Sequence, residues 1–523
     1  CRMRDRDRNS GDQYLPAGNE PELKERAHGA AGKEAKRIKG VKGYSVMEKR
    51  KSKDGKPFIH LFNTKMGNYL FDVNKNQIVK ISESVYDYLS NACSEAIEKE
   101  IENCIDDLKE KGFLKDNHPQ KTEHPVNEYY GFLMNNNLEQ LTLQVTQKCN
   151  LNCEYCVYSG NYANRHHANK WMTFETAKIA IDYLISHSSD SDEISLGFYG
   201  GEPLLAFDLI QRCVIYAEKI LEGRKITFNF TTNGTLLTEE KLDFLVQHNF
   251  AILVSLDGPE NVQNRHRKYA NSEIGSFETV MKNLKKIKMK YPNYFHEKIA
   301  FNSVLDPSYP FEEICKFTLT NEIVKDSSFM SSIISDTYAY SKNIYNSTFV
   351  QEYEYERFKG FLWLIGKLDK SQIPPILRES FTDIKKMAVM FERFKQEQLP
   401  AKGHRGGPCI PGVKKLFVTV DGKLFPCERV SESSEMTCIG DIREGINIER
   451  ALKILNIENV TSEKCKNCWA YFHCFLCVAQ ADEGKCLSDL TLCRECVKCK
   501  HSVEETMKDY VTLKEFGYNY ELF

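Results

Sequence analysis

Three cysteines share one polar loop, at Cys149, Cys153 and Cys156, with the spacing C-x3-C-x2-C. The loop follows residues 141–145, where apolar and polar side chains alternate, a pattern that predicts a strand. Three thiolates on one tight loop can bind three irons of a [4Fe–4S] cluster and leave the fourth iron open to a small molecule. A zinc site is the alternative, but structural zinc normally takes four protein ligands and this loop supplies three. The spacing therefore favours a cluster with one open iron.

A second field of cysteines lies near the end of the chain. Of the nineteen cysteines, eleven fall in this field: Cys409, Cys427, Cys438, Cys465, Cys468, Cys474, Cys477, Cys486, Cys493, Cys496 and Cys499. No secretory signal or membrane-length apolar run is visible, so the clustering favours metal ligation in a reducing compartment over disulfides. Zinc remains the alternative for the C-x2-C pairs. We expect a cytoplasmic protein.

The elements that must position the first cysteine loop alternate between strand and helix. After the loop, further strands are expected at 194–199, 226–230, 251–255, 299–304 and, more weakly, 328–334, most of them separated by helical stretches. Repeated βα units imply a parallel sheet whose chemistry lies at the carboxyl ends of the strands. The polar motifs follow the strands at those ends, which favours one shared site.

These motifs resemble the radical S-adenosylmethionine (SAM) superfamily. The cysteine loop is followed by Gly200-Gly201-Glu202-Pro203, which matches the family's GGEP motif, and by a Ser255-Leu256-Asp257-Gly258 segment with Arg267 beyond it. The resemblance implies an α/β fold, a partial (β/α)6 TIM-like barrel over residues 138–335. It also implies one SAM-binding [4Fe–4S] cluster on Cys149, Cys153 and Cys156.

The resemblance assigns roles to further residues, position by position. Tyr155 would lie beside the adenine, and Gly200 and Gly201 would allow close backbone approach. Glu202 would take the amino group of SAM. The remaining contacts would come from Asn233 and Ser255, to the ribose and carboxylate, and from Arg267, to SAM or the substrate.

The second cysteine field resembles the SPASM domain, which holds two auxiliary [4Fe–4S] clusters. By position, Cys409, Cys427 and Cys477 would ligate the first of them. The second would take Cys465, Cys468, Cys474 and a late cysteine, for which we favour Cys496 over Cys493 and Cys499. The family usually spaces one pair as C-x3-C, whereas this chain has C-x2-C at Cys474 and Cys477. Cys438 would complete the first cluster or be a bystander that leaves an iron open, and Cys486 is unassigned.

The region before the barrel predicts a small domain of its own. Three short strands and two helical stretches over residues 55–118 resemble a RiPP recognition element, a winged-helix-like domain that binds a leader peptide by strand addition. A structural cap on the barrel is the alternative. The expected organisation is completed by a disordered extension, a helical bridge, the SPASM domain and a tail, at residues 1–46, 336–400, 401–505 and 506–523.

The order of these parts predicts an enzyme that modifies peptides. We expect thioether cross-links, from cysteine sulfur to carbon, in a ribosomally made precursor of the sactipeptide or ranthipeptide type. An anaerobic sulfatase-type maturase that forms formylglycine, a carbon–carbon cross-linking maturase and a noncatalytic zinc-stabilised scaffold are the alternatives. The expected partners are the precursor peptide and an electron donor such as flavodoxin or ferredoxin. The formal charge of −2 gives no reason to expect nucleic acid or membrane binding.

Overall fold

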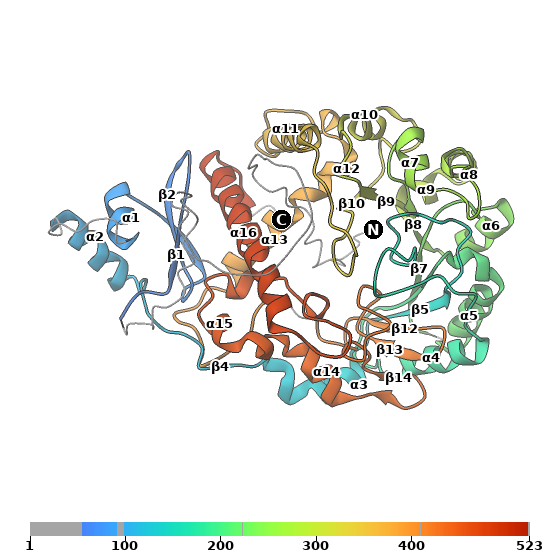
Figure 1. Ribbon diagram of the computed structural model, residues 1–523, viewed down its shortest axis with the longest axis horizontal. Helices are drawn as coiled ribbons and strands as arrows, with labels where there is room; N and C mark the ends of the chain where they lie inside the picture. The colour runs from blue at the N-terminus through green and yellow to red at the C-terminus, as the bar shows by residue number, and fades with distance from the viewer. Residues whose placement is uncertain (1–54, 91–98, 222, 408, 521–523) are drawn as a thin grey trace, which may run out of the picture.

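The computed structural model describes residues 55–90, 99–221, 223–407 and 409–520 (Figure 1). The extension expected at residues 1–46 lies outside these ranges. Within them, no helix combines the length and the apolar character needed to cross a membrane.

Six parallel strands form the central sheet, in the order β10-β9-β8-β7-β6-β5. The strands are β5 (Gln140–Thr146), β6 (Ile194–Gly200), β7 (Ile226–Thr232), β8 (Ala251–Ser255), β9 (Ile299–Leu305) and β10 (Phe329–Ile333). The helices between them are α4 (Phe174–Ser186), α5 (Phe207–Ile220), α6 (Glu239–Gln247), α7 (Glu260–His266), α8 (Phe277–Lys290), α9 (Pro292–Lys298) and α10 (Glu312–Thr320). They follow the outside of the curved sheet on the right of Figure 1. The α/β barrel predicted from the sequence is confirmed.

Strand β5 is buried along its whole length. Its alternating pattern predicts one polar face, yet Gln144 is fully buried beside Leu143 and Val145. Parallel strands are covered on both faces, so the polar side chains of β5 must find partners inside the barrel. They do so in the functional site described below.

The C-terminal region extends the barrel sheet. Strand β12 (Leu416–Val418) pairs in parallel with β5 and turns back into β13 (Lys423–Phe425), followed by β14 (Gly440–Asp441) and β15 (Gly445–Ile446). The rest of this region forms α14 (Ile448–Leu455), η5 (Ile457–Thr461), α15 (Ser462–Lys466), η6 (Tyr471–His473), η7 (Val478–Gln480) and α16 (Asp489–Glu515). The C-terminal region, which contains the second cysteine field, is therefore joined through β12 to β5, the strand that leads into the first cysteine loop.

Residues 506–523, expected as a tail, largely continue helix α16 to Glu515. Val511 and Leu513 are buried, because this part of the helix packs against α13 (Thr382–Arg393). The tail expectation is therefore corrected over residues 506–515. The preceding bridge holds α11 (Ser347–Leu364), η3 (Lys370–Gln372), α12 (Pro375–Arg378) and η4 (Glu379–Phe381).

The N-terminal region is a three-stranded antiparallel sheet with two helices, at the left of Figure 1. Its elements are β1 (Ile59–Thr64), β2 (Gly67–Asp72), β3 (Gln77–Ile81), α1 (Glu83–Ser90) and α2 (Lys99–Glu110). The ring of His60 on β1 stacks on Trp469 at 3.6 Å, and its Nε2 lies 2.9 Å from Glu504 on α16. Among the described residues β3 pairs only with β2, so its other edge is free.

A short connection joins this sheet to the barrel. It contains β4 (Lys121–Thr122), η1 (Pro125–Tyr129) and α3 (Tyr130–Asn136). Strand β4 pairs in parallel with β11 (Lys402–Gly403), which begins the C-terminal region. This connection thereby joins the N-terminal sheet to the barrel and to the C-terminal region.

Candidate functional site

The loop of Cys149, Cys153 and Cys156 begins at the carboxyl end of β5, as predicted. The backbone N–H of Leu151 donates to Cys149 Sγ at 3.4 Å, and that of Tyr158 donates to Cys156 Sγ at 3.5 Å. Hydrogen bonds of this kind stabilise a thiolate and tune a bound iron–sulfur cluster. The loop thus suits thiolate ligands.

The three thiols also act on one another electrostatically. Burial raises the pKa of both Cys149 and Cys153 to about 12, and the neighbouring cysteines and Glu202 add to the effect on Cys149. Thiols in this setting stay protonated at neutral pH unless a cation binds, because metal binding is coupled to thiol deprotonation. Across the described residues, no group of three His, Cys, Asp or Glu side chains converges as ligands of a single ion would.

Gly200 and Gly201 bring the end of β6 against the start of the cysteine loop. A Cβ atom on Gly200 would lie 2.0 Å from the carbonyl oxygen of Thr146, and one on Gly201 would lie 2.2 Å from that of Lys148. The backbone N–H of Gly201 donates to Thr146 at 2.9 Å, and that of Glu202 donates to Lys148 at 3.0 Å. The close approach that these glycines allow is therefore to the cysteine loop.

Glu202 is 1% exposed and joins the ends of two strands. Its Oε1 accepts from the N–H of Leu204 at 3.0 Å and from the hydroxyl of Thr232 at 2.8 Å, and its Oε2 accepts from the N–H of Asn233 at 2.7 Å. Burial raises the pKa of the carboxyl despite these bonds. The side chain expected to contact SAM thus also fixes the end of β7 relative to β6.

Asn233 carries this network to the first cysteine. Its amide Nδ2 donates to Asn150 Oδ1 at 2.8 Å and lies 3.8 Å from Cys149 Sγ, while its Oδ1 accepts from the hydroxyl of Thr235. Ser255 ends β8 and is 8% exposed. Both residues lie at the carboxyl edge of the sheet, where the sequence predicts them.

The sequence predicts that the guanidinium of Arg267 contacts SAM or the substrate. In the structure it binds a protein carboxylate. Its Nε and Nη2 donate to the two oxygens of Asp257 at 2.8 and 3.0 Å. Asp257 also accepts from the Tyr155 hydroxyl, and the guanidinium lies 5.4 Å from the Tyr155 ring. Arg267 therefore anchors the cysteine loop to the end of β8, a role that the sequence analysis missed because Asp257 was taken only as part of a motif.

The first predicted auxiliary group forms around Cys477. The charges of Cys409 and Cys427 both act on this thiol, whose pKa is raised by burial. Cys409 and Cys427 therefore each lie near enough to Cys477 to act on its thiol electrostatically. The thiol of Cys438 donates to the carbonyl of Gly440, two residues along the chain, at 3.5 Å.

The second predicted group forms around Cys474. Cys465, Cys468 and Cys474 act on the thiol of Cys496, and the thiol of Cys499 lies 3.9 Å from that of Cys474. Cys496 and Cys499 are three residues apart on α16 and therefore share one helix face. Cys493 lies one turn earlier, 3.3 Å from the amine of Lys464, and Cys486 is exposed.

A buried polar network connects the barrel with the C-terminal region and was not predicted from the sequence. Gln144 donates to the Glu432 carboxylate at 2.8 Å, Arg165 pairs with the same carboxylate at 3.0 Å, and Tyr158 donates to it at 3.0 Å. Glu432 is far from the other three residues in sequence, and none of the four belongs to a recognised motif. The buried polar position within β5 is the one signal that could have pointed to them.

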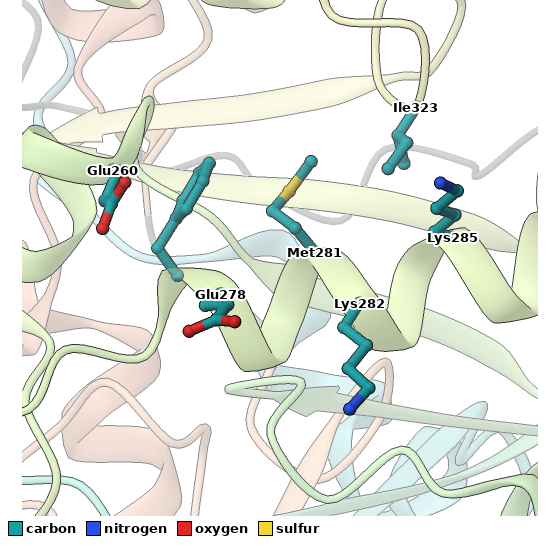
Figure 2. Close-up of a pocket in the computed structure, with 7 residues that line it drawn as sticks. Glu260, Glu278, Met281, Lys282, Lys285 and Ile323 are labelled. Carbon is teal, nitrogen blue, oxygen red and sulfur yellow. The ribbon is translucent and has the colours of Figure 1, made fainter.

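A separate groove lies along α8, outside the barrel. The groove has a volume of about 470 Å³ and is lined by Glu260, Phe277, Glu278, Met281, Lys282, Lys285 and Ile323. Figure 2 shows this lining, with all of these residues except Phe277 labelled. None of the predicted site residues lines it. The cysteines and their partners form the candidate functional site.

Comparisons with known proteins agree with this arrangement. Residues 143–318 match the family model of the radical SAM superfamily. The radical SAM cyclopropyl synthase TigE of Paramaledivibacter caminithermalis is 30% identical over 254 residues, which cover 46% of this chain and 50% of TigE. The serine-type anaerobic sulfatase-maturating enzyme of Bacteroides thetaiotaomicron is 34% identical over 145 residues, 27% of this chain and 34% of that enzyme. The chain thus spans half or less of the length of these relatives.

The fold also resembles a solved structure, native anSMEcpe with bound AdoMet. The TM-score is 0.52 at 20% identity, and the match covers 71% of this chain and 99% of that chain. At this identity the likeness shows the fold alone. The match to an enzyme superfamily disfavours the noncatalytic zinc scaffold.

Proposed function

From the match of residues 143–318 to the radical SAM superfamily, we propose that the chain is a radical SAM enzyme that installs thioether cross-links in a ribosomally made precursor peptide. Cys149, Cys153 and Cys156 would hold the [4Fe–4S] cluster that the superfamily implies. When bound, SAM and this cluster supply the radical that removes a hydrogen atom from a substrate carbon. A thioether then requires the loss of one proton from a substrate thiol and the transfer of one electron to an acceptor.

The observation that supports the proposal is that Cys409 and Cys427 both act electrostatically on Cys477, and we propose that these three cysteines hold one auxiliary cluster. A [4Fe–4S] cluster on three cysteines keeps one iron without a protein ligand. Such a group, held by these cysteines, would offer an iron for a substrate thiolate and would supply an acceptor for the electron released when sulfur joins carbon. Cys438 supports this reading because its thiol already donates to Gly440.

The other side chains would position the reacting parts. Glu202 and Asn233 fix the ends of two strands around the first cysteine. The pair of Arg267 and Asp257 holds Tyr155, and with it the cysteine loop, at the end of β8. Preorganised polar groups in a closed site orient a reactive centre and limit access of water. The Glu202 carboxylate at this edge suits the amino group of SAM, and the amide and hydroxyl donors of Asn233 and Ser255 suit its carboxylate.

The N-terminal sheet would bind the leader of the precursor. Strand β3 has a free edge among the described residues, and such an edge can accept a peptide as an added strand. Hydrogen–deuterium exchange with a leader peptide should slow the amides of residues 77–81. The amides of β1, the strand that packs against α16, serve as the internal control. Protection of β1 alone would contradict strand addition at β3.

Carbon–carbon bond formation is the second candidate, and one observation favours it. TigE, a relative by sequence, is a cyclopropyl synthase. The sulfatase-maturating relatives keep formylglycine formation as a further alternative. The products differ in mass and in free thiols, so one assay separates all three.

The test uses anaerobically reconstituted protein, SAM, a reductant and the cysteine-rich peptide encoded beside the gene. The product is weighed intact, after disulfide reduction, with and without thiol alkylation. We expect a loss of two hydrogens for each thiol that becomes blocked. Loss of hydrogens with all thiols free would replace the proposal by carbon–carbon bonding, and conversion of a cysteine to an aldehyde would replace it by formylglycine formation.

A matched pair of variants tests the open iron. Cys477→Ser should abolish cross-linking while reductive cleavage of SAM continues, because the first group then has two cysteines. Cys438→Ser should retain cross-linking, because that thiol is not a ligand. Loss of cross-linking in Cys438→Ser, with SAM cleavage intact, would contradict the three-cysteine group.

A further inference from the structure

A buried arginine lies between the two groups of C-terminal cysteines. Arg405 is 1% exposed, and its Nη1 donates to Cys474 Sγ at 3.7 Å. The charges of Cys474, Cys465 and Cys477 all act on the guanidinium and raise its pKa. Arg405 therefore contacts the second group of cysteines through Cys474 and acts electrostatically on Cys477 of the first group.

The guanidinium is not satisfied by the protein around it. Its Nε and Nη2 have no hydrogen-bond partner, and the same holds for both carboxylate oxygens of the buried Glu458 and for the hydroxyl of Tyr471. A buried charge without a hydrogen-bond partner is costly, so native structures rarely keep one without a compensating group. Glu458 acts electrostatically on Arg405 but accepts no hydrogen bond from it. The unmatched N–H donors of Arg405 therefore call for an anion at the cysteines.

The backbone is built to hold Arg405 in this position. A Cβ atom on Gly406 would lie 2.2 Å from the carbonyl oxygen of Phe472, and one on Gly407 would lie 2.5 Å from that of Leu476. The N–H of Gly406 donates to the carbonyl of Tyr471 at 3.2 Å. The two glycines thus let the segment after Arg405 pack directly on the loop that carries Cys474.

We propose that Arg405 is a positioning residue that compensates the negative charge of an iron–sulfur centre on the second cysteine group and raises its reduction potential. The inference rests on the proposal that residues 401–505 hold auxiliary clusters. Thiolates and bridging sulfides give such a centre a net negative charge, which grows by one on reduction. A fixed, desolvated cation stabilises the reduced form more than the oxidised one, and net charge and hydrogen bonds to sulfur are known determinants of cluster potential.

The position of Arg405 gives this charge a consequence for electron flow. It acts more closely on Cys474 than on Cys477, since only Cys474 accepts a hydrogen bond from it. Arg405 should therefore raise the potential of the second centre more than that of the first. The second centre is then a better electron acceptor than it would be without this cation.

The experiment uses the full chain with Cys149, Cys153 and Cys156 replaced by alanine, so that only auxiliary centres remain. Iron and sulfide content are measured first, and the potentials follow from an anaerobic redox titration read by electron paramagnetic resonance. Arg405→Gln should lower the potential of one centre by at least about 59 mV, a tenfold change in a one-electron equilibrium. Arg405→Lys, which keeps the charge, should recover at least half of the shift.

Lys500→Gln is the matched control. Lys500 also acts on a cysteine of the second group, Cys468, but it is partly exposed, so solvent screens its charge. Its shift should be less than half of that in Arg405→Gln. Equal shifts in the two variants would overturn a special role for the buried cation.

The outcomes separate the inference from its premise. Absence of iron in the alanine background would refute the auxiliary clusters, and the inference would fall with them. Bound clusters with an unchanged potential in Arg405→Gln would overturn the inference alone. Loss of iron in Arg405→Gln but not in Arg405→Lys would support charge compensation, whereas loss in both would show that shape rather than charge is required.

Discussion

At the scale of single residues, the neighbouring cysteine loop explains why the GGEP segment contains two glycines. Gly201 lies so close to Lys148 that a Cβ atom would overlap the carbonyl carbon as well as the oxygen, at 2.4 and 2.2 Å. Backbone hydrogen bonds on both sides prevent the two segments from moving apart. The motif therefore serves the cysteine loop before any cofactor is bound.

Gly201→Ala should destabilise the protein by about 2–4 kcal/mol, the range of substitutions that force a backbone shift in a packed site. Denaturant unfolding of the metal-free protein measures this. Gly131→Ala is the control: Gly131 lies in α3, where a Cβ meets no atom within 4 Å, and alanine is the better helix former. Equal stability of Gly201→Ala and the wild type would contradict the close approach.

At the scale of elements, the short helix η1 depends on a histidine that must stay neutral. The Nδ1 of His124 accepts a hydrogen bond from the N–H of Val126 at 3.2 Å and so caps the helix. Burial, with a contribution from His404, lowers the pKa of His124 to about 4. Protonation would remove the acceptor and add a buried charge next to a second histidine.

The folded state should therefore lose stability in acid. The pKa of His124 is lower in the folded chain than the ordinary 6.5, so the unfolded chain binds more protons between these values. This contribution is complete above about pH 6.5 and is lost as the pH falls toward 4, by roughly 2–3 kcal/mol. Denaturant unfolding of the metal-free protein at pH 7 and pH 5 measures the loss.

His124→Asn keeps a capping acceptor but cannot titrate. Its stability should change less with pH than that of the wild type over the same range. A pH dependence as steep as that of the wild type would assign the acid sensitivity to other groups.

At the scale of the whole molecule, the barrel and the C-terminal region are joined by two kinds of charge pair. Arg165 and Glu432 are buried together, with side chains 2% and 11% exposed, whereas Lys170 and Asp421 are 53% and 59% exposed. Removing one partner of a buried pair leaves an uncompensated charge, which costs far more than the loss of an exposed pair.

Glu432→Gln should lower the free energy of unfolding by about 3–5 kcal/mol, because Arg165 keeps its charge without a carboxylate. Asp421→Asn, the exposed control, should change it by at most about 1 kcal/mol. Chemical denaturation of the metal-free variants compares the two. Similar small losses in both would mean that water reaches Arg165.

Part of this organisation was readable from the sequence alone. The βα repeats predicted the barrel, and the cysteine loop, Glu202, Asn233 and Ser255 lie at the carboxyl edge as expected. These features depend on local periodicity and on motifs within a few residues of each strand end. They can therefore be predicted without knowledge of distant contacts. The three N-terminal strands were predicted for the same reason.

Only the tertiary structure decided which side chains meet across long separations. Nothing in the sequence indicates that Arg405 would face Cys474, that Glu432 would pair with Arg165, or that β12 would pair with β5. Such contacts join residues with no shared motif. The polar ones form because buried polar groups must find partners wherever the fold brings them. The local pattern of the chain fixed where the cysteines lie, and long-range packing determined the charges that surround them.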